Sequence, residues 1–299
     1  MAKPPPRLWT KETLAHGVAF SLTKEQAHYL GTVLRLKEGD TVLFFNGKDG
    51  EWSAPLEAIS RKGGVARPEA QTRPQPASAM GPDLFFAPLK KGPTDFIVQK
   101  ATELGVEMVC PVLTDRTIAQ RVPLERLGLI AREAAEQCER LDVPLVKQPV
   151  RLADLLEDDE IDHILFCDEA GDNPDARWGG AAGRAALPGQ ALERFATEYG
   201  QRQVESSLKN KDLQQVRDSE GTRTAVGQTS SSSGGRWAVL IGPEGGFTPA
   251  ERQAIRADKR TAAISLGPRI LKAETAALVA LTVWQLFIGD LSANPDEER

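Results

Sequence analysis

The chain has few of the residues that stabilise small secreted proteins or bind metals. It contains three cysteines, Cys110, Cys138 and Cys167, and three histidines among 299 residues. Because the cysteines are odd in number, widely spaced and set in apolar or helical patterns, they argue against a disulfide framework and against a zinc site. So few histidines leave little material for a histidine-based triad. We therefore expect chemistry that needs no metal.

Long apolar runs are also absent. No stretch approaches the roughly 20 apolar residues of a membrane-spanning helix. The first ten residues, MAKPPPRLWT, lack the apolar segment of a signal peptide. We therefore expect a soluble, cytoplasmic protein with no membrane partner. Its 299 residues allow two domains on a prior of ~150 residues for each.

The chain lacks an excess of positive charge, since its net charge is −5. This acidity is local: residues 152–235 hold 8 Lys and Arg against 16 Asp and Glu, so the remainder carries +3. Residues 1–75 alone hold 11 basic and 8 acidic side chains. The charge distribution is therefore compatible with a basic surface that faces RNA.

Residues 1–75 predict a small β-rich domain. A capping-box spacing from Thr23 to Gln26 opens a helix over residues 24–36. Residues 41–59 predict two strands around turn signals at Asn46-Gly47 and Asp49-Gly50. The Pro- and Ala-rich stretch over residues 66–82 predicts a linker.

Beyond the linker, strands and helices alternate, which favours an α/β domain. The predicted strands are 83–89, 107–113, 163–169, 237–241 and 262–266, and the predicted helices are 94–104, 124–140, one beginning at Pro249, and 270–286. On the second helix we expect a buried stripe of Ile130, Ala134, Cys138 and Leu141 beside a Glu136–Arg140 pair. The polar residues 171–235 end in GQTSSSSGG and predict a largely disordered insertion.

Two glycine-bearing turns follow predicted strands, LIGPEGGFTPAE at 240–251 and SLGPRILK at 265–272. In the first, Thr248, Pro249 and Glu251 fit the N-cap, the first position and the capping-box partner of a helix. In open α/β folds ligands bind at such strand ends. The first loop lacks the Lys-Ser/Thr ending of a phosphate-binding Walker loop, and it also lacks the G-x-G-x-x-G spacing of a dinucleotide-binding loop. The two loops predict one pocket lined by backbone groups, with two unrelated turns as the alternative.

Five segments together resemble a known family. They are HYLGTVLRLKEGDTVLFFNGKDGEW, KGPTDFIVQKATELGVEMVCPVLTDRT, EAAEQCERLDVP, LIGPEGGFTPAE and LGPRILKAETAAL. In this order they resemble the motifs of the RsmE family, the 16S ribosomal RNA uridine-N3 methyltransferases of the SPOUT superfamily. The resemblance implies a PUA-like RNA-binding β-barrel over residues 1–75 and a trefoil-knotted α/β SPOUT methyltransferase domain over residues 76–299. It also implies S-adenosyl-L-methionine as cofactor, a homodimer, and methylation of N3 of one uridine, number 1498, of the small-subunit RNA.

The resemblance also implies site residues. The cofactor wall comprises Leu240, Ile241, Gly242, Gly245, Gly246, Leu266, Gly267, Ile270 and Leu271. Removing the uracil N3 proton needs a base and charge stabilisation, for which the candidates are Glu103, Glu133 and Glu244, with Arg116 or Arg140 as partner. Candidates for RNA contacts are Arg7, Lys11, Arg35, Lys37, Lys90, Lys91, Arg121, Arg269 and Lys272.

The chain departs from the family pattern at two places. Lys272 stands where the family usually has arginine, which removes a planar fork suited to phosphate or a uracil edge. The acidic insertion replaces a short connection. Two other functions stay open, a SPOUT ribose 2′-O-methyltransferase and a non-enzymatic RNA-binding assembly factor. The N-terminal motifs from His28 to Trp52 argue against the first, and the intact glycines of both loops argue against the second.

Overall fold

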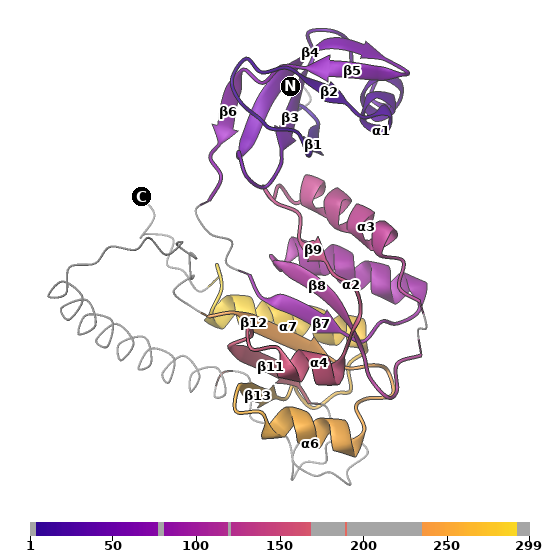
Figure 1. Ribbon diagram of the computed structural model, residues 1–299, viewed down its shortest axis with the longest axis vertical. Helices are drawn as coiled ribbons and strands as arrows, with labels where there is room; N and C mark the ends of the chain where they lie inside the picture. Colours follow the sequence, from indigo (N-terminus) through magenta and orange to yellow (C-terminus); the bar gives the residue numbers. More distant parts are fainter. Residues whose placement is uncertain (1–3, 77–80, 119–120, 169–188, 190–234, 292–299) are drawn as a thin grey trace, which may run out of the picture. The chain divides into compact units, whose positions relative to one another are not determined.

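The computed structural model describes residues 4–76, 81–118, 121–168, 189 and 235–291 (Figure 1). The chain divides into two compact units. The first comprises residues 1–79, 98–103 and 125–145, and the second comprises residues 80–97, 104–124 and 146–299. The predicted insertion over residues 171–235 lies outside the described residues except at its glycines 189 and 235.

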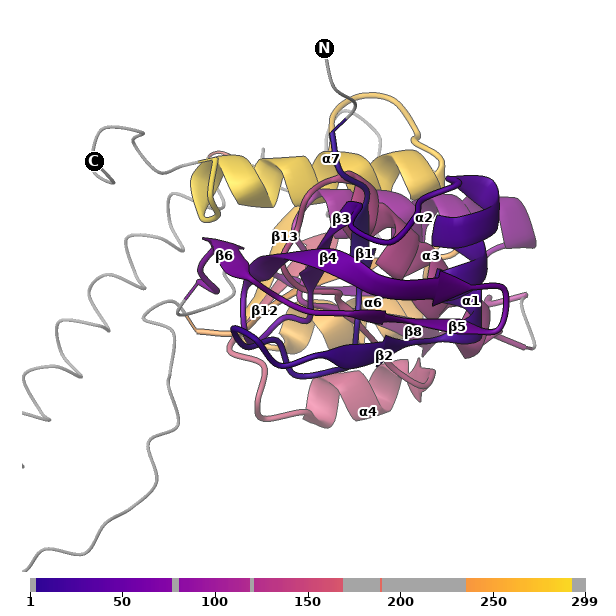
Figure 2. The same cartoon turned by 90° about the horizontal axis from the view of Figure 1, so that it is seen from above.

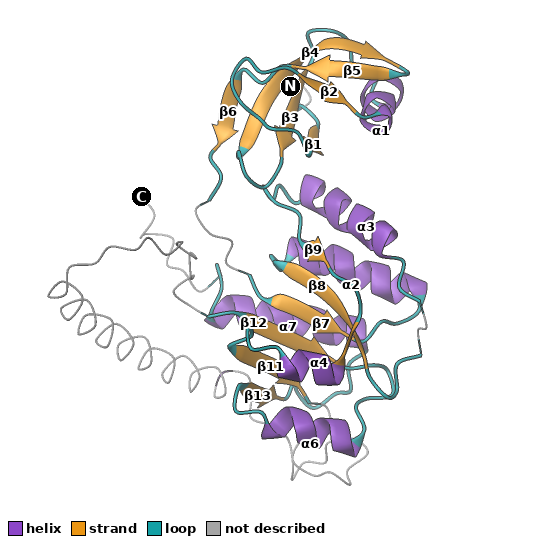
Figure 3. Cartoon of the chain, in the orientation of Figure 1, coloured by secondary structure: helices purple, strands orange, loops and turns teal. Residues whose placement is uncertain are grey.

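The first unit is built on a six-stranded sheet with the order β1-β3-β4-β5-β2, in which β6 also pairs with β4 (Figure 3). The strands are β1 (Arg7–Trp9), β2 (Phe20–Leu22), β3 (Thr41–Phe45), β4 (Glu51–Ser60), β5 (Gly63–Ala66) and β6 (Ala70–Arg73). Only β1 and β3 pair in parallel among these neighbours. Alternating apolar residues fill the interior, where Phe20 and Phe44 meet edge to face at 5.0 Å.

Most predicted elements of this unit are confirmed. The capping box of Thr23 and Gln26 opens α1 (Lys24–His28), which continues as a π-helix over Tyr29–Val33. Strands β3 and β4 form the predicted hairpin. The linker prediction for residues 66–82 was wrong over β6, because a strand with polar side chains at an open edge has no apolar alternation to reveal it.

A buried ionic network ties β1 and β4 to α3 (Leu124–Gln137) and to the residues that follow it. The Glu51 carboxylate is 5% exposed and accepts from the guanidinium groups of Arg7 and Arg73. Burial opposes its ionisation, but bonds from Arg73, Arg7 and Thr72 outweigh burial and lower the pKa of Glu51. Arg7 also donates to the carbonyls of Ala135 and Arg140. A positive charge paired with Glu51 therefore stabilises the C-terminal end of α3.

The predicted buried stripe on α3 was confirmed at Ala134 and wrong at Cys138, and Ile130 and Leu141 are only half-buried. The buried residues of this helix are Leu127, Ala131, Ala134 and Ala135, and Cys138 is exposed. Glu136 accepts a bond from the backbone nitrogen of Trp9, and Arg140 pairs with Asp142 at 2.9 Å in place of the predicted Glu136–Arg140 partnership. A backbone nitrogen from β1 and a carboxylate two residues along the chain therefore replace the expected pair.

The second unit is built on a seven-stranded sheet with the order β10-β8-β7-β12-β11-β13 and with β9 beside β8. The strands are β7 (Asp83–Phe86), β8 (Met108–Leu113), β9 (Leu145–Val146), β10 (Val150–Arg151), β11 (His163–Cys167), β12 (Trp237–Ile241) and β13 (Thr261–Ile264). Every neighbouring pair along the main path is parallel. This confirms the predicted α/β class, since parallel strands need crossover connections.

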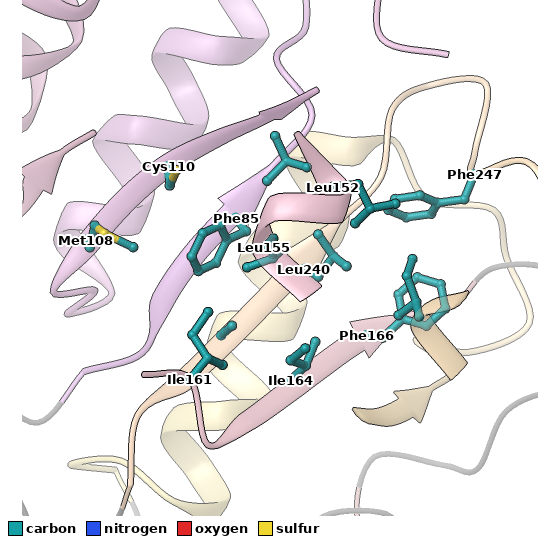
Figure 4. Close-up of a cluster of buried hydrophobic side chains, with 13 residues drawn as sticks. Phe85, Met108, Cys110, Leu152, Leu155, Ile161, Ile164, Phe166, Leu240 and Phe247 are labelled. Atoms are coloured by element: carbon teal, nitrogen blue, oxygen red, sulfur yellow. The ribbon is translucent and has the colours of Figure 1, made fainter. Parts of the chain in front are cut away.

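Helices cover this sheet on both faces. The helices are α2 (Lys91–Glu103), which begins in this unit, α4 (Leu152–Glu157), α6 (Pro249–Ala257) and α7 (Ala273–Phe287). From above, α7 and α4 lie on opposite sides of the strands (Figure 2). Leu152 and Leu155 of α4 pack into a cluster with Phe85, Leu240 and Phe166 (Figure 4). The near-continuous apolar strands are typical of a sheet buried on both faces.

Three short elements between residues 141 and 162 had no sequence prediction, namely β9, β10 and α4. Strands of two residues are too short to show a period of two. Within the described part of the chain, no helix has both the length and the apolar character to cross a membrane.

Candidate functional site

Two glycine loops lie at the same edge of the second sheet. Residues 242–248 leave the end of β12, and residues 265–272 leave the end of β13. Both strands run parallel to β11, which lies between them. Because parallel strands end at one edge, the two loops flank the end of β11, where α/β proteins bind their ligands.

The glycines of these loops serve different purposes. Gly246 and Gly267 have φ of 65° and 105°, a region that side chains disfavour. A Cβ on Gly267 would meet no atom within 4 Å, so open space lies beside this backbone. At Gly242 a Cβ would lie 2.6 Å from the Phe247 ring. Gly242 is therefore required for packing, whereas the backbone of Gly267 has open space beside it that a ligand can approach.

The loop after β8 holds the first glycine loop in place. Arg116 Nη1 donates to the Gly245 carbonyl at 2.7 Å, and the Asp115 nitrogen donates to Glu251 at 2.8 Å. Glu251 is also the capping-box partner of Thr248 at the start of α6, which confirms the predicted helix start. Residues far apart in the sequence thus fix this loop.

A pocket of about 80 Å³ opens between three loops of this unit. The loops follow β7, β8 and β12, which are adjacent in the sheet. Its lining residues are Pro88, Leu89, Lys90, Arg116, Ile118, Pro243 and Glu244. Two cations and one carboxylate therefore face a small space with apolar walls. The volume is several times the roughly 10–15 Å³ that one water needs.

A buried charge cluster lies at the end of β11. Asp168 is fully buried and pairs with Arg252 at 3.0 Å and with Arg256 at 2.7 Å. Both arginines belong to α6, the helix that begins directly after the first glycine loop. The carboxylate therefore fixes α6 against the sheet and, through it, the end of that loop.

The predicted cofactor residues lie around the two loops. Leu240 and Ile241 are buried in β12, Leu266 and Leu271 are half-buried, and Ile270 is 59% exposed.

The candidates for catalysis fall into two groups. Arg116 and Glu244 meet in the pocket of the second unit. Glu103, Glu133 and Arg140 belong to the first unit, where Glu103 pairs with Lys100 at 2.8 Å and Arg140 donates to the Thr102 carbonyl at 2.9 Å.

The predicted RNA contacts also divide. The guanidinium of Arg7 is engaged with Glu51 and its side chain is 9% exposed, so it serves packing within the first unit. The exposed candidates are Lys11, Arg35 and Lys37 in that unit and Lys90, Lys91, Arg121, Arg269 and Lys272 in the second. Lys272 is the N-cap residue of α7 and its side chain is 83% exposed.

Several residues of the site had no sequence prediction. Pro88, Leu89 and Ile118 complete the pocket, and Asp168, Arg252 and Arg256 form the buried cluster. The sequence held one usable signal, because Pro88 and Asp168 stand at the ends of predicted strands. The partners of Asp168 lie 84 and 88 residues away and had no local signal.

The fold is a parallel α/β sheet with two glycine loops at its carboxyl edge, the edge at which open α/β proteins bind their ligands. Residues 78–187 and 191–285 match the family model of the RNA methyltransferase domain, and residues 22–69 match that of the RNA methyltransferase PUA domain. The chain belongs to this RNA methyltransferase family, and the predicted membership and fold class are confirmed.

Two curated relatives match almost the whole chain. The ribosomal RNA small subunit methyltransferase E of Rickettsia conorii is 28% identical over 282 residues, covering 94% of this chain and 95% of the relative. The enzyme of the same name from Bacillus subtilis is 26% identical, covering 91% and 92%.

Solved structures share the fold. A methyltransferase from Legionella pneumophila, solved in complex with S-adenosylmethionine, is 25% identical with a TM-score of 0.67, covering 95% of this chain and 98% of that one. Ribosomal RNA small subunit methyltransferase E from Neisseria gonorrhoeae, bound to the same molecule, is 24% identical with a TM-score of 0.68, covering 94% and 97%. Among the described residues, no group of His, Cys, Asp and Glu is arranged to hold a metal ion.

Proposed function

We propose that the protein transfers a methyl group from S-adenosyl-L-methionine to N3 of a uridine in 16S ribosomal RNA of the small subunit. The observation that carries the proposal is the pair of glycine loops at one edge of the sheet, the first of which lines a pocket together with Lys90 and Arg116. The relatives named for small-subunit ribosomal RNA methylation support the RNA substrate. A cytoplasmic location follows from that substrate.

The residues of the loops fit this cofactor. Gly246 and Gly267 present backbone without side chains, and the space beside Gly267 is open. Half-buried Leu266 and Leu271 supply apolar contacts suited to adenine and to methionine carbons. The cofactor supplies a methyl group on a positively charged sulfur, and transfer leaves the electron pair of that bond on sulfur. The Legionella protein binds the same molecule with a similar fold.

The test is a comparison of 16S ribosomal RNA from a strain without this gene and from the same strain with the gene restored. Mass mapping is expected to find one N3-methyluridine missing from the first RNA and present in the second. If the missing group is instead a ribose 2′-O-methyl, the enzyme modifies the sugar. If neither changes, the protein is not a methyltransferase of this RNA.

Gly245→Val is expected to abolish binding of the cofactor while the fold survives. A Cβ at Gly245 meets only the Arg116 side chain, at 3.5 and 3.7 Å, so the substitution does not strain the core. The branched side chain presses on Arg116, whose bond to the Gly245 carbonyl fixes this loop, and so displaces the backbone that the cofactor approaches. Titration calorimetry with S-adenosylmethionine measures the loss, and circular dichroism checks the fold. Wild-type affinity in this variant would place the cofactor elsewhere.

We propose that the enzyme is a homodimer through the outer face of α7. Ala277, Ala280, Leu281 and Trp284 of this helix are buried against the sheet, whereas Leu278, Val279, Val283 and Leu286 remain partly or largely exposed. Val279, Val283 and Leu286 recur at helical spacing and form an apolar stripe, with Leu278 at its side. An exposed apolar stripe on a helix supports contact with a second protein surface.

Val279→Glu combined with Val283→Glu is expected to convert the dimer to a monomer. The two carboxylates would be buried without partners at the interface, which costs more than the contact gains. Light scattering after gel filtration measures the mass. The matched control is Leu145→Glu, at a residue that is 57% exposed on β9, which is expected to leave the mass at twice that of the chain. A monomeric wild type would contradict the proposal.

A further inference from the structure

We propose that the pocket between the loops after β7, β8 and β12 is the uracil subsite, in which Lys90 and Arg116 donate to the two carbonyl oxygens and Glu244 takes the N3 proton. This inference rests on the proposed function and assigns the residues that select uracil as the base. It separates the base from the cofactor, which we place at the glycine loops after β12 and β13.

The chemistry of the lining side chains matches one edge of uracil. That edge presents an acceptor, a donor and an acceptor, which are O2, the N3 proton and O4. Lys90 and Arg116 are donors only, and an ionised Glu244 is an acceptor only. The pocket therefore offers two donors and one acceptor. Cytosine has an unprotonated N3 and an amino group at this edge, so it would leave a donor of the pocket facing a donor of the base.

The apolar walls suit a flat ring. Pro88, Leu89, Ile118 and Pro243 line the remainder of the pocket, and Ile118 is 74% exposed. A base that leaves its RNA stack needs such a surface to replace the stacking that it loses. With about 80 Å³ the pocket is small.

The backbone that carries these side chains is fixed before substrate binds. Thr94 is buried and bonds the nitrogen and the carbonyl of Leu89, next to Lys90. The Ala87 nitrogen donates to the Ile241 carbonyl at 3.0 Å, which ties the loop after β7 to the loop after β12. The turn from Pro243 to Gly246 is closed at 2.8 Å, with Glu244 inside it. Such bracing favours a set of groups that need little rearrangement on binding.

The position of Glu244 gives it a role in the transfer. It lies in the glycine loop after β12, the strand that borders β7 on the side of the pocket and β11 on the side of the second glycine loop. A Glu244 oxygen takes the proton from N3, and the electron pair freed at N3 forms the bond to the methyl carbon. The positive charges of Lys90 and Arg116 stabilise the negative charge that develops on the uracil oxygens.

The first test is Glu244→Gln in the full-length dimer, assayed in single turnovers on small ribosomal subunits from the deletion strain. We expect the rate near neutral pH to fall by about 100-fold or more, as for loss of a general base. The deficit should shrink as the pH rises, because N3 of uridine then ionises unaided. Affinity for S-adenosylmethionine should stay unchanged. Glu157→Gln, an exposed carboxylate on α4, is the matched control and should behave as wild type.

The second test combines the Lys90→Met variant with substrates in which one uracil oxygen is replaced by sulfur, a weaker hydrogen-bond acceptor. The variant keeps the aliphatic stem and removes the donor, and we expect kcat/KM to fall by about 10-fold or more. Subunits reconstituted with 4-thiouridine or 2-thiouridine at the target lose one good acceptor each. Each enzyme is compared on thiolated and on natural subunits. One of the two thiouridines should slow wild type but not Lys90→Met. The oxygen that this thiouridine replaces is then the partner of Lys90. Lys259→Met, an exposed lysine of the same unit, is the control.

The outcomes separate this inference from the proposed function. If wild type forms N3-methyluridine and Glu244→Gln is equally active, the subsite lies elsewhere and the enzyme assignment stands. A deficit that does not change with pH, or a loss of S-adenosylmethionine affinity, would make Glu244 a residue of the cofactor loop and overturn its role as base. If wild type methylates no N3 of uridine, the proposed function itself fails.

Discussion

Gly242→Ala is expected to lower the stability of the second unit and to weaken S-adenosylmethionine binding by at least 10-fold, although it adds one methyl group. That Cβ would lie 2.6, 3.0 and 3.2 Å from three atoms of the Phe247 ring. Phe247 is 3% exposed and meets Phe166 edge to face at 5.3 Å, so the ring has little room to retreat (Figure 4). Overpacking of this kind costs about 1–3 kcal/mol.

The loss of affinity follows from the position of Phe247, which ends the glycine loop. Moving its ring displaces the turn between Gly242 and Thr248, and the Arg116 bond to the Gly245 carbonyl must then change. Calorimetry measures the affinity, and urea unfolding measures the stability. Gly245→Ala is the control for stability, because its Cβ makes only ordinary contacts. Equal stability of the two variants would show that the Phe247 ring adjusts freely.

The sequence predicted those parts of the fold that depend on local pattern. The strand before Gly242 is a short apolar run, and the helix after it begins with Thr248 and Glu251, so both elements were confirmed. The capping box at Thr23 was confirmed for the same reason. A cap is decided within four residues, which is the range that a sequence displays directly.

The sequence could not assign a reason to each glycine. Of the three glycines in GPEGG, only Gly246 has a positive φ, whereas Gly242 makes room for an aromatic ring five residues later. The pocket is likewise hidden in the sequence, because the order β8-β7-β12 brings Arg116 and Glu244 together across 128 residues. Arg7 and Arg140, predicted as functional residues, bind carbonyls and carboxylates elsewhere in the chain, and composition does not reveal such partners.

Asp168→Asn is expected to have the largest effect on stability of any single polar substitution in the second unit. The carboxylate has no exposed surface and offsets two guanidinium groups, of which that of Arg252 is 8% exposed. Without it, the buried Arg252 guanidinium loses an ion pair to which it donates twice, and Arg256, whose side chain is 28% exposed, loses another. Removing one partner of a buried ion pair costs about 3–5 kcal/mol. Urea unfolding followed by far-ultraviolet circular dichroism measures this change in free energy of unfolding.

The same substitution should also weaken cofactor binding, because the cluster fixes the helix on which the first glycine loop ends. The matched control is Glu57→Gln, which removes the carboxylate of another bidentate arginine pair. That pair is exposed, with side chains at 42% and 39%, so water replaces the lost partner and stability should hardly change. If Asp168→Asn destabilises the protein by less than about 1 kcal/mol, the range of an exposed pair, then water reaches the cluster. The anchoring of α6 would then have to come from its apolar contact through Ile255.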